Sequence, residues 1–202
     1  MLLTVEDVTA WVPQAAADTA LIEGAIEQAT ALANGYCRRR LDQADYDERY
    51  DVQPGEADLL LRQHPVSAVA AVHLDPDGTN ELLTIITDFT VDYQAGVLTR
   101  GASGWSIAGY EAKTDVAGWW PSGDQIVRVE YTAGYTPEDL ADPDLAGLKV
   151  AFLELVGWRL SYRGGAGVSN ESADGINTTR EPLVRGIPES IAGLLERYVR
   201  VA

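Results

Sequence analysis

The chain has 202 residues, of which 46% are hydrophobic, enough to bury the core of one ordinary domain or of a domain with a sizeable insertion. Its formal net charge is −16, and such a surface repels phosphate, which argues against a protein that grips the DNA backbone. No apolar stretch approaches the roughly 20 residues of a membrane span, and the N-terminus lacks the pattern of a signal peptide, so we expect assembly in the cytosol.

Two helices are predicted at the start of the chain. Thr4 and Asp7 form a variant of the capping box for a short helix that Pro13 ends. Asp18 or Thr19 caps a longer helix. Its apolar side chains recur at helical spacing: Ile22, Ile26, Ala29, Ala33 and Tyr36. Arginines at 38–40 follow, and positive charge at a helix C-terminus complements the helix dipole.

From Tyr46 onward the apolar period changes from helical to alternating, which predicts strands. The turn residues Gln53-Pro54-Gly55 and the run 75–78 separate some of them, and residues 93–97 predict a tight hairpin. A loop rich in glycine and tryptophan spans 101–123 and holds Trp105, Trp119 and Trp120. The predicted strands cover residues 46–52, 58–62, 69–74, 82–86, 89–93, 97–100 and 125–131.

A long helix is predicted in the C-terminal half. Asp142 is its expected N-cap and Pro143 its first helical residue. One stripe of the helix is apolar: Leu145, Leu148, Phe152, Leu155 and Val156. The other faces are apolar too, with Ala151, Leu153, Trp158 and Leu160. Such a helix needs two partners, one of which could be another copy of the chain.

The segment after Arg163 is polar and rich in glycine, and a last helix is predicted from Pro188. On that helix Ile191, Leu194, Leu195 and Tyr198 share a face. With strands in the middle and helices at the ends, the predicted class is α+β. We expect one compact domain in which an antiparallel β-rich region (46–135) is inserted between N-terminal helices (1–45) and a helical region (136–202). The helical region holds the long helix, a flexible loop (164–186) and a short terminal helix.

Residues able to carry chemistry are few and scattered. His64 precedes a proline and His73 alternates inside a predicted strand, so both are interpreted as structural. Cys37 is predicted to be a small buried hydrophobe rather than a nucleophile. The run Asp75-Pro76-Asp77-Gly78 fails as a calcium loop, because its first and last ligands would be His73 and Thr84. We therefore predict no catalytic, cofactor-binding or metal-binding residues, and no cofactor.

Several short runs carry a resemblance to a known family. In chain order they are Tyr-Cys-Arg-Arg-Arg-Leu (36–41), His-Pro-Val-Ser-Ala-Val (64–69), Asp-Phe-Thr-Val-Asp-Tyr-Gln-Ala-Gly-Val-Leu (88–98), V-x-Y-x-A-G-Y (129–135), D-L-x-x-L-K-x-A (144–151), Trp-Arg-Leu-Ser-Tyr-Arg (158–163) and Ile-Pro-Glu-Ser-Ile (187–191). Taken together, they resemble the head-to-tail adaptor (connector) proteins of long-tailed double-stranded DNA bacteriophages and gene transfer agents. These motifs are structural rather than catalytic, and they extend over the whole chain.

The resemblance implies a non-enzymatic structural virion protein, placed at the neck, where head and tail join, after assembly in the host cytoplasm. Its copies would form a ring, about twelve by family analogy, beneath the portal protein. The ring would extend the DNA channel and offer a platform to the downstream neck or tail-completion protein. DNA would pass through without specific binding, and no membrane would be involved. The simpler adaptors are almost wholly helical, and this chain departs from them in its β-rich region.

Large apolar and arginine side chains on the last two helices are the predicted interface residues, toward the core or toward another subunit. They are Phe152, Trp158, Arg159, Tyr162, Arg163, Ile191, Leu194 and Tyr198. The loop 164–186 and the last helix are predicted to dock on the portal. Trp158, on a helix, is expected to matter more for folding or assembly than Trp120, in a loop. Two alternatives stay open: another neck component, such as a head-completion or tail-terminator protein, or an acidic carbohydrate-binding or hydrolytic domain that uses the tryptophan-rich loop.

Overall fold

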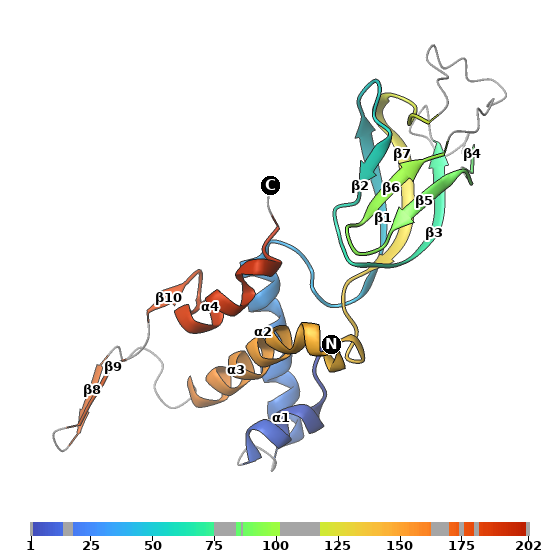
Figure 1. Cartoon of the computed structure of the whole chain (residues 1–202). Helices are drawn as coiled ribbons and strands as arrows, with labels where there is room; N and C mark the ends of the chain where they lie inside the picture. Colours follow the sequence, from blue (N-terminus) through green and yellow to red (C-terminus); the bar gives the residue numbers. More distant parts are fainter. Residues whose placement is uncertain are drawn as a thin grey trace. The chain divides into compact units, whose positions relative to one another are not determined.

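The computed structural model describes residues 2–13, 18–74, 84–85, 87–101, 118–162, 170–173, 176–179 and 182–200. The chain divides into two compact units. The helical unit comprises residues 1–42 and 135–202, and the β unit comprises residues 43–134. Each unit has its own hydrophobic core. Helices at both ends and antiparallel strands in the middle confirm the α+β class (Figure 1).

The first two helices of the helical unit begin at the caps that the sequence predicts. In α1 (Val5–Trp11) the side chains of Thr4 and Asp7 form the complete capping box. Asp18, rather than Thr19, caps α2 (Thr19–Cys37), since its Oδ1 accepts the Leu21 amide at 3.0 Å. The predicted apolar stripe of α2 is confirmed, because all five of its residues are buried.

Helix α3 (Ala146–Tyr162) crosses α2 and supplies the centre of the helical core (Figure 1). A 3-10 turn, Pro143–Leu145, capped by Asp142, leads directly into it. The buried stripe is confirmed, with Leu148, Phe152, Leu155 and Val156 fully buried. Lys149 on α3 reaches Asp7 on α1 at 2.7 Å and ties these two helices together. Among the described residues, no helix is long and apolar enough to cross a membrane.

The C-terminal end of α2 is covered by the last part of the chain. Helix α4 (Glu189–Leu195) continues into a 3-10 turn, Glu196–Tyr198, and the Arg200 amide donates to the Cys37 carbonyl at 2.9 Å. Cys37 is fully buried there, as predicted, and burial raises the pKa of its thiol to about 11. The thiol is therefore protonated near neutral pH and a poor nucleophile.

Two hairpins lie in the segment for which the sequence predicts only a polar loop, 164–186. Strand β8 (Asn170–Ala173) pairs with β9 (Ile176–Thr179), and β10 (Leu183–Val184) pairs with β11 (Ile187–Pro188). Glycine- and serine-rich composition hides such pairing, because backbone hydrogen bonds rather than apolar alternation define short hairpins.

The β unit contains two antiparallel sheets that share one core. The first has the order β1 (Ala44–Val52), β7 (Gly123–Ala133), β3 (Val66–Leu74) and β4 (Thr84–Ile85). The second has the order β2 (Asp58–Leu60), β6 (Val97–Arg100) and β5 (Phe89–Asp92). All seven predicted strands are present, and β7 is longer at both ends than the prediction.

The hairpin predicted at 93–97 is also present, between β5 and β6. Asp92 Oδ1 accepts the amides of Gln94 and Ala95 at 3.1 and 2.9 Å. Gly96 follows with φ of 68°, and a Cβ there would lie 3.0 Å from the Cβ of His64. Glycine therefore suits this position for both its backbone conformation and its close packing.

Trp120 corrects one expectation from the sequence. It lies in the segment predicted as a loop, 101–123, yet only 2% of its surface is exposed. Its amide donates to Glu56 O at 2.7 Å, and its indole Nε1 donates to Leu98 O at 3.2 Å. Trp120 lies outside the helices and strands, as predicted, but it belongs to the core of the β unit. Trp119 is 44% exposed, and Trp105 lies outside the described residues.

Candidate functional site

Strand alternation gives the four-stranded sheet one apolar face and one charged face. On β7, Val127, Val129 and Tyr131 are buried, whereas Arg128 and Glu130 alternate with them and stay partly accessible. Strand β1 pairs with β7 in a register that sets Asp47 opposite Glu130 and Asp45 opposite Thr132. Directly opposed residues point to the same side of a sheet, so these polar side chains gather on the outer face.

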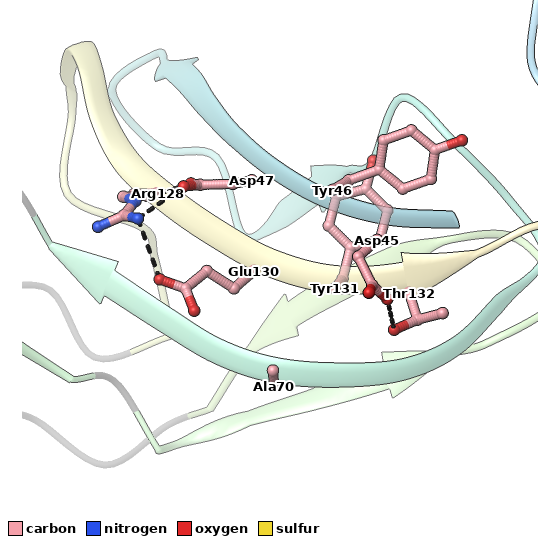
Figure 2. Close-up of a pocket in the computed structure, with 8 residues that line it drawn as sticks. All are labelled: Asp45, Tyr46, Asp47, Ala70, Arg128, Glu130, Tyr131 and Thr132. Carbon is pink, nitrogen blue, oxygen red and sulfur yellow. Dashed lines mark hydrogen bonds and ion pairs between the residues drawn. The ribbon is translucent and has the colours of Figure 1, made fainter. Parts of the chain in front are cut away.

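A shallow depression of about 380 Å³ lies on this outer face (Figure 2). Three carboxylates and one guanidinium belong to its lining. Figure 2 shows Arg128 between Asp47 and Glu130, with Asp45 and Tyr46 toward the other end. The lining residues are Asp45, Tyr46 and Asp47 of β1, Ala70 of β3, and Arg128, Glu130, Tyr131 and Thr132 of β7.

Arg128 is shared between two of the three carboxylates. Its Nε and Nη2 contact Asp47 Oδ1 and Oδ2 at 2.7 and 2.6 Å, a bidentate pair. Its Nη2 also lies 3.2 Å from Glu130 Oε1, which His73 Nε2 approaches at 3.6 Å. The hydrogen bonds from Arg128 hold the pKa of Asp47 below its ordinary value.

Asp45 is the carboxylate with no cation beside it within the described part of the chain. Its Oδ1 accepts the Thr132 hydroxyl at 2.7 Å, and its side chain is exposed. The neighbouring Tyr46 alternates to the inner side of the sheet, where its ring stacks on Tyr131 with centroids 5.3 Å apart.

A buried polar network lies on the inner side of the same sheet. Glu48 Oε2 accepts the hydroxyls of Tyr50 at 2.6 Å and of Tyr131 at 2.8 Å. The amides of Arg62 and Gln63 donate to these two hydroxyls at 3.1 and 3.3 Å. Burial raises the pKa of both phenols well above the ordinary value. The network joins β1 and β7 to the segment after β2 and so fixes the floor of the depression.

The outer face of the four-stranded sheet offers charged groups that hydrogen bonds hold in place. Within the described residues, no group of three His, Cys, Asp or Glu side chains is placed to hold a metal ion. Arg128 and Thr132 orient the carboxylates of the outer face through hydrogen bonds. What the site can offer to a ligand is carboxylate groups and one guanidinium.

The predicted interface residues lie mostly in the helical core. Phe152, Ile191 and Tyr198 are buried there, and Trp158 and Leu194 are half-buried against the same core. Tyr198 also meets Tyr135 edge-to-face, with centroids 6.2 Å apart. These side chains form an interface between helices of one unit.

Arg159 is the charged member of the predicted set with a described side chain. It stacks on Trp158, 5.6 Å from the ring, and its Nε donates to Gln28 on α2 at 3.1 Å. Tyr162 is the last residue of α3, and its side chain and Arg163 lie outside the described residues. A role for any of these residues in contact with a second copy stays a prediction.

The charged sheet face was missed by the sequence reasoning, although a signal for it exists. Polar side chains occupy every second position of two strands. They are Asp45, Asp47 and Arg49 in β1, and Arg128, Glu130 and Thr132 in β7. Each run alone is an ordinary solvated strand face. The register that brings them together depends on two strands about eighty residues apart, which alternation cannot reveal.

Comparison with known proteins identifies the fold. No protein-family model matches the chain, and no curated protein matches it in sequence. Solved structures do match. A chain of the neck of a native gene transfer agent (GTA) particle, computed with C12 symmetry, has a TM-score of 0.55 at 16% identity. That match covers 100% of this chain and 95% of the other.

Two further solved chains have a similar fold, and both also come from GTA particles. One, from the neck of an empty GTA particle computed with C6 symmetry, has a TM-score of 0.53 at 17% identity over 92% of this chain and 81% of that one. The other, from the virion of a native GTA particle, has a TM-score of 0.52 at 16% identity over 92% and 80%. The resemblance seen in the sequence is confirmed at the level of the fold.

Proposed function

We propose that this chain is a head-to-tail adaptor, a non-enzymatic structural protein in the neck of a phage-like particle. Its copies form a ring beneath the portal protein, about twelve by analogy with the C12 neck. The ring extends the DNA channel and offers a platform to the downstream neck or tail-completion protein. The observation that carries the proposal is the fold likeness over 100% of this chain and 95% of a GTA neck protein.

The charge distribution supports a conduit for DNA. The β unit holds fifteen acidic and five basic residues, a net charge of −10, and the helical unit holds sixteen and ten, a net charge of −6. A channel wall with such a surface repels phosphate, so DNA passes without adhering to it. Specific DNA binding would instead need a basic, phosphate-neutralising groove.

The alternatives have different support. Another neck component, such as a head-completion or tail-terminator protein, would share the neck setting of the matching chains, and the experiment below distinguishes it. A carbohydrate-binding or hydrolytic domain built on the tryptophan-rich loop has less support, because Trp120 is buried in the core and hydrogen-bonded there. A sugar platform needs exposed aromatic faces.

Electron microscopy of the purified chain mixed with the portal protein of the same particle tests the proposal. We expect a ring of added density directly below the portal, with one copy of the chain per portal subunit by mass. Portal alone, and portal mixed with the Phe152→Ala variant, whose helical core is destabilised, are the controls. Binding to the end of a tail tube instead would identify a tail terminator, and failure to join any portal or tail complex would overturn a neck function.

A further inference from the structure

The outer face of the three-stranded sheet combines carboxylates with an exposed leucine. Strand alternation buries Leu59 and Leu98 in the core of the β unit and turns every second residue of the three strands outward. We call the outward residues the aspartate face: Asp58 and Leu60 of β2, Val97 and Thr99 of β6, and Thr90 and Asp92 of β5. None of these six residues is positively charged, and Leu60 is 66% exposed.

The strand register brings the apolar and acidic side chains of this face together. Leu60 lies opposite Val97, and Val97 lies opposite Asp92. Asp58 lies opposite Thr99, whose hydroxyl it accepts at 2.6 Å. Opposed residues on one side of a sheet are close neighbours, so two carboxylates flank the exposed leucine and its valine neighbour on a single surface.

A surface of the opposite charge lies at the C-terminal end of α2, where three arginines from distant parts of the chain meet. Arg38 directly follows the helix. Arg185 donates from Nη1 to Tyr36 O at 3.4 Å, and the Arg200 amide donates to Cys37 O at 2.9 Å. All three arginines are exposed.

The fold itself makes little use of these arginines. Within the described part of the chain, the side chains of Arg38 and Arg200 make no hydrogen bond or ion pair. Arg38 has a φ of 54°, in the left-handed region that favours glycine at this position after a helix. Leu183 and Val184, just before Arg185, are 52% and 37% exposed. We call these five residues the arginine surface, and arginine around an apolar centre is typical of protein–protein interfaces.

We infer that the arginine surface of one copy binds the aspartate face of a second copy, and this inference rests on the proposed ring. The guanidinium groups of one surface match the carboxylates of the other, and the exposed aliphatic side chains of both leave water on contact. Duplex DNA would match the guanidinium groups alone, and the net charge of −16 opposes its approach. The β unit, at −10, instead attracts the arginine surface of a neighbour over longer range.

The contact has a consequence for symmetry. The two surfaces belong to different units of the chain, so each copy gives its arginine surface to one neighbour and its aspartate face to the other. Such heterologous contacts generate closed rings when the rotation between copies closes. Acidic copies repel one another, and the pairing of arginine with aspartate offsets this repulsion at each junction.

Charge changes in the full-length chain test the contact. Leu60→Lys places a cation on the aspartate face, at a side chain that is already largely exposed. Arg38→Glu/Arg200→Glu reverses the arginine surface at side chains without described bonds. Trp11→Lys is the matched control for Leu60→Lys, because Trp11 is also large, apolar and 50% exposed, but on α1. Arg38→Lys/Arg200→Lys keeps the charge of the arginine surface.

Self-association is measured by sedimentation velocity and ring formation by electron microscopy, with and without portal, at about 0.15 M salt. Leu60→Lys and the double glutamate variant should each associate roughly tenfold or more weakly than the wild type, whereas Trp11→Lys and the double lysine variant should match it. If Leu60→Lys fails to fold, Asp58→Asn removes charge from the face and keeps an oxygen for the Thr99 hydroxyl.

An equimolar mixture of Leu60→Lys and the double glutamate variant should recover assembly. In the mixture, glutamate meets lysine at one junction, and arginine meets aspartate at the next. A mixture that stays dissociated would overturn the inference, because a contact within one chain gains nothing from a second variant.

Two further results would overturn the inference and leave the proposed function standing: rings that form equally well from wild type and both variants, or equal weakening by Leu60→Lys and Trp11→Lys. Labelled duplex DNA that binds the wild type but not the double glutamate variant, with self-association intact in both, would assign the arginines to phosphate and reject the inference. A wild-type chain that neither self-associates nor rings the portal would reject the inference and the proposed function together.

Discussion

The two units are held together by different means. The helical core is built from aliphatic and aromatic side chains of α2, α3 and α4, such as Ile26, Phe152 and Leu195, all fully buried. The β unit adds to its apolar core a carboxylate, Glu48, that accepts two phenol hydroxyls, and an indole, Trp120, bonded to a strand carbonyl. The helical core is specified by the volume and spacing of its apolar side chains. The core of the β unit is specified also by the geometry of its hydrogen bonds.

Because the two cores differ, different kinds of substitution should destabilise the two units. A hydrophobic core suffers from lost volume, because the surrounding helices relax only partly around a cavity. A polar network suffers from the loss of one partner, because the remaining groups stay buried without a bond. We therefore expect truncations to break the helical unit and near-isosteric polar substitutions to break the β unit.

Phe152→Ala should have the largest effect. The side chain is fully buried at the centre of the helical core, and truncation of such a residue costs roughly 3–5 kcal/mol. Chemical denaturation followed by the helical far-ultraviolet signal measures the loss. Leu194→Ala, on the half-buried side of α4, is the control and should cost clearly less. Equal costs would show that α3 is not the centre of this core.

Trp120→Ala should cost about as much, roughly 3–5 kcal/mol, in the β unit. The indole is 2% exposed, and its loss would leave Leu98 O without a donor. Trp158→Ala should cost less, about 1–2 kcal/mol, because that ring is only partly buried at the edge of the helical core. This order is the reverse of the one that the sequence suggests. Denaturation of both variants, with the remaining tryptophans as fluorescence probes, decides between the two orders.

The sequence predicts the features of the helical unit that depend on neighbouring residues, but not the features of the β unit that depend on distant ones. Caps and helical stripes are local, so Asp18, Asp142 and the stripe through Phe152 could be read directly from spacing. Trp120 could not, because its burial depends on Leu98 in another strand. Glu48 lies at an inward position that alternation reserves for apolar side chains, and its two tyrosine partners, with Arg62 at 3.9 Å, explain it.

The candidate site follows the same pattern. The alternation of Asp45, Asp47 and Arg49 predicts an outward face, but the depression needs the pairing of β1 with β7, far apart in sequence. The C-terminal end of α2 likewise meets residues that are far from it in sequence, since Arg185 donates to Tyr36 O and the Arg200 amide donates to Cys37 O. In the sequence, only the arginine run at 38–40 marks this end of the helix.

Glu48→Gln should destabilise the β unit by about 1–3 kcal/mol. The amide keeps the size of the side chain but replaces a charged acceptor of two hydroxyls with a neutral one that also brings donors. Denaturant unfolding of the β unit is the measurement. Glu56→Gln is the control, since Glu56 accepts a single turn amide, that of Gln53 at 2.9 Å. Equal effects of the two changes would show that the buried network adds nothing to stability.

The phenols of the same network predict a loss of stability in alkali. Burial raises the folded-state pKa of Tyr50 and Tyr131 above the ordinary value of about 10. Above that pH the unfolded chain releases these protons while the folded chain keeps them, so stability falls as pH rises, by about 1.4 kcal/mol per pH unit for each phenol. Tyr131→Phe should make the slope above pH 10 shallower, and an unchanged slope would contradict this account.

Asp47→Asn should have the smallest effect, below about 1 kcal/mol, because an exposed ion pair is well solvated in water. The Asp47 side chain is 55% exposed although its contact with Arg128 is bidentate. Arg128 lowers the pKa of Asp47 in the folded state, so the contribution of this pair is present above the unfolded value near 4 and is lost as pH falls below it. The difference in unfolding free energy between wild type and variant should therefore shrink from pH 7 to pH 3. A difference that persists at pH 3 would mean that Asp47 stabilises the sheet by something other than its charge.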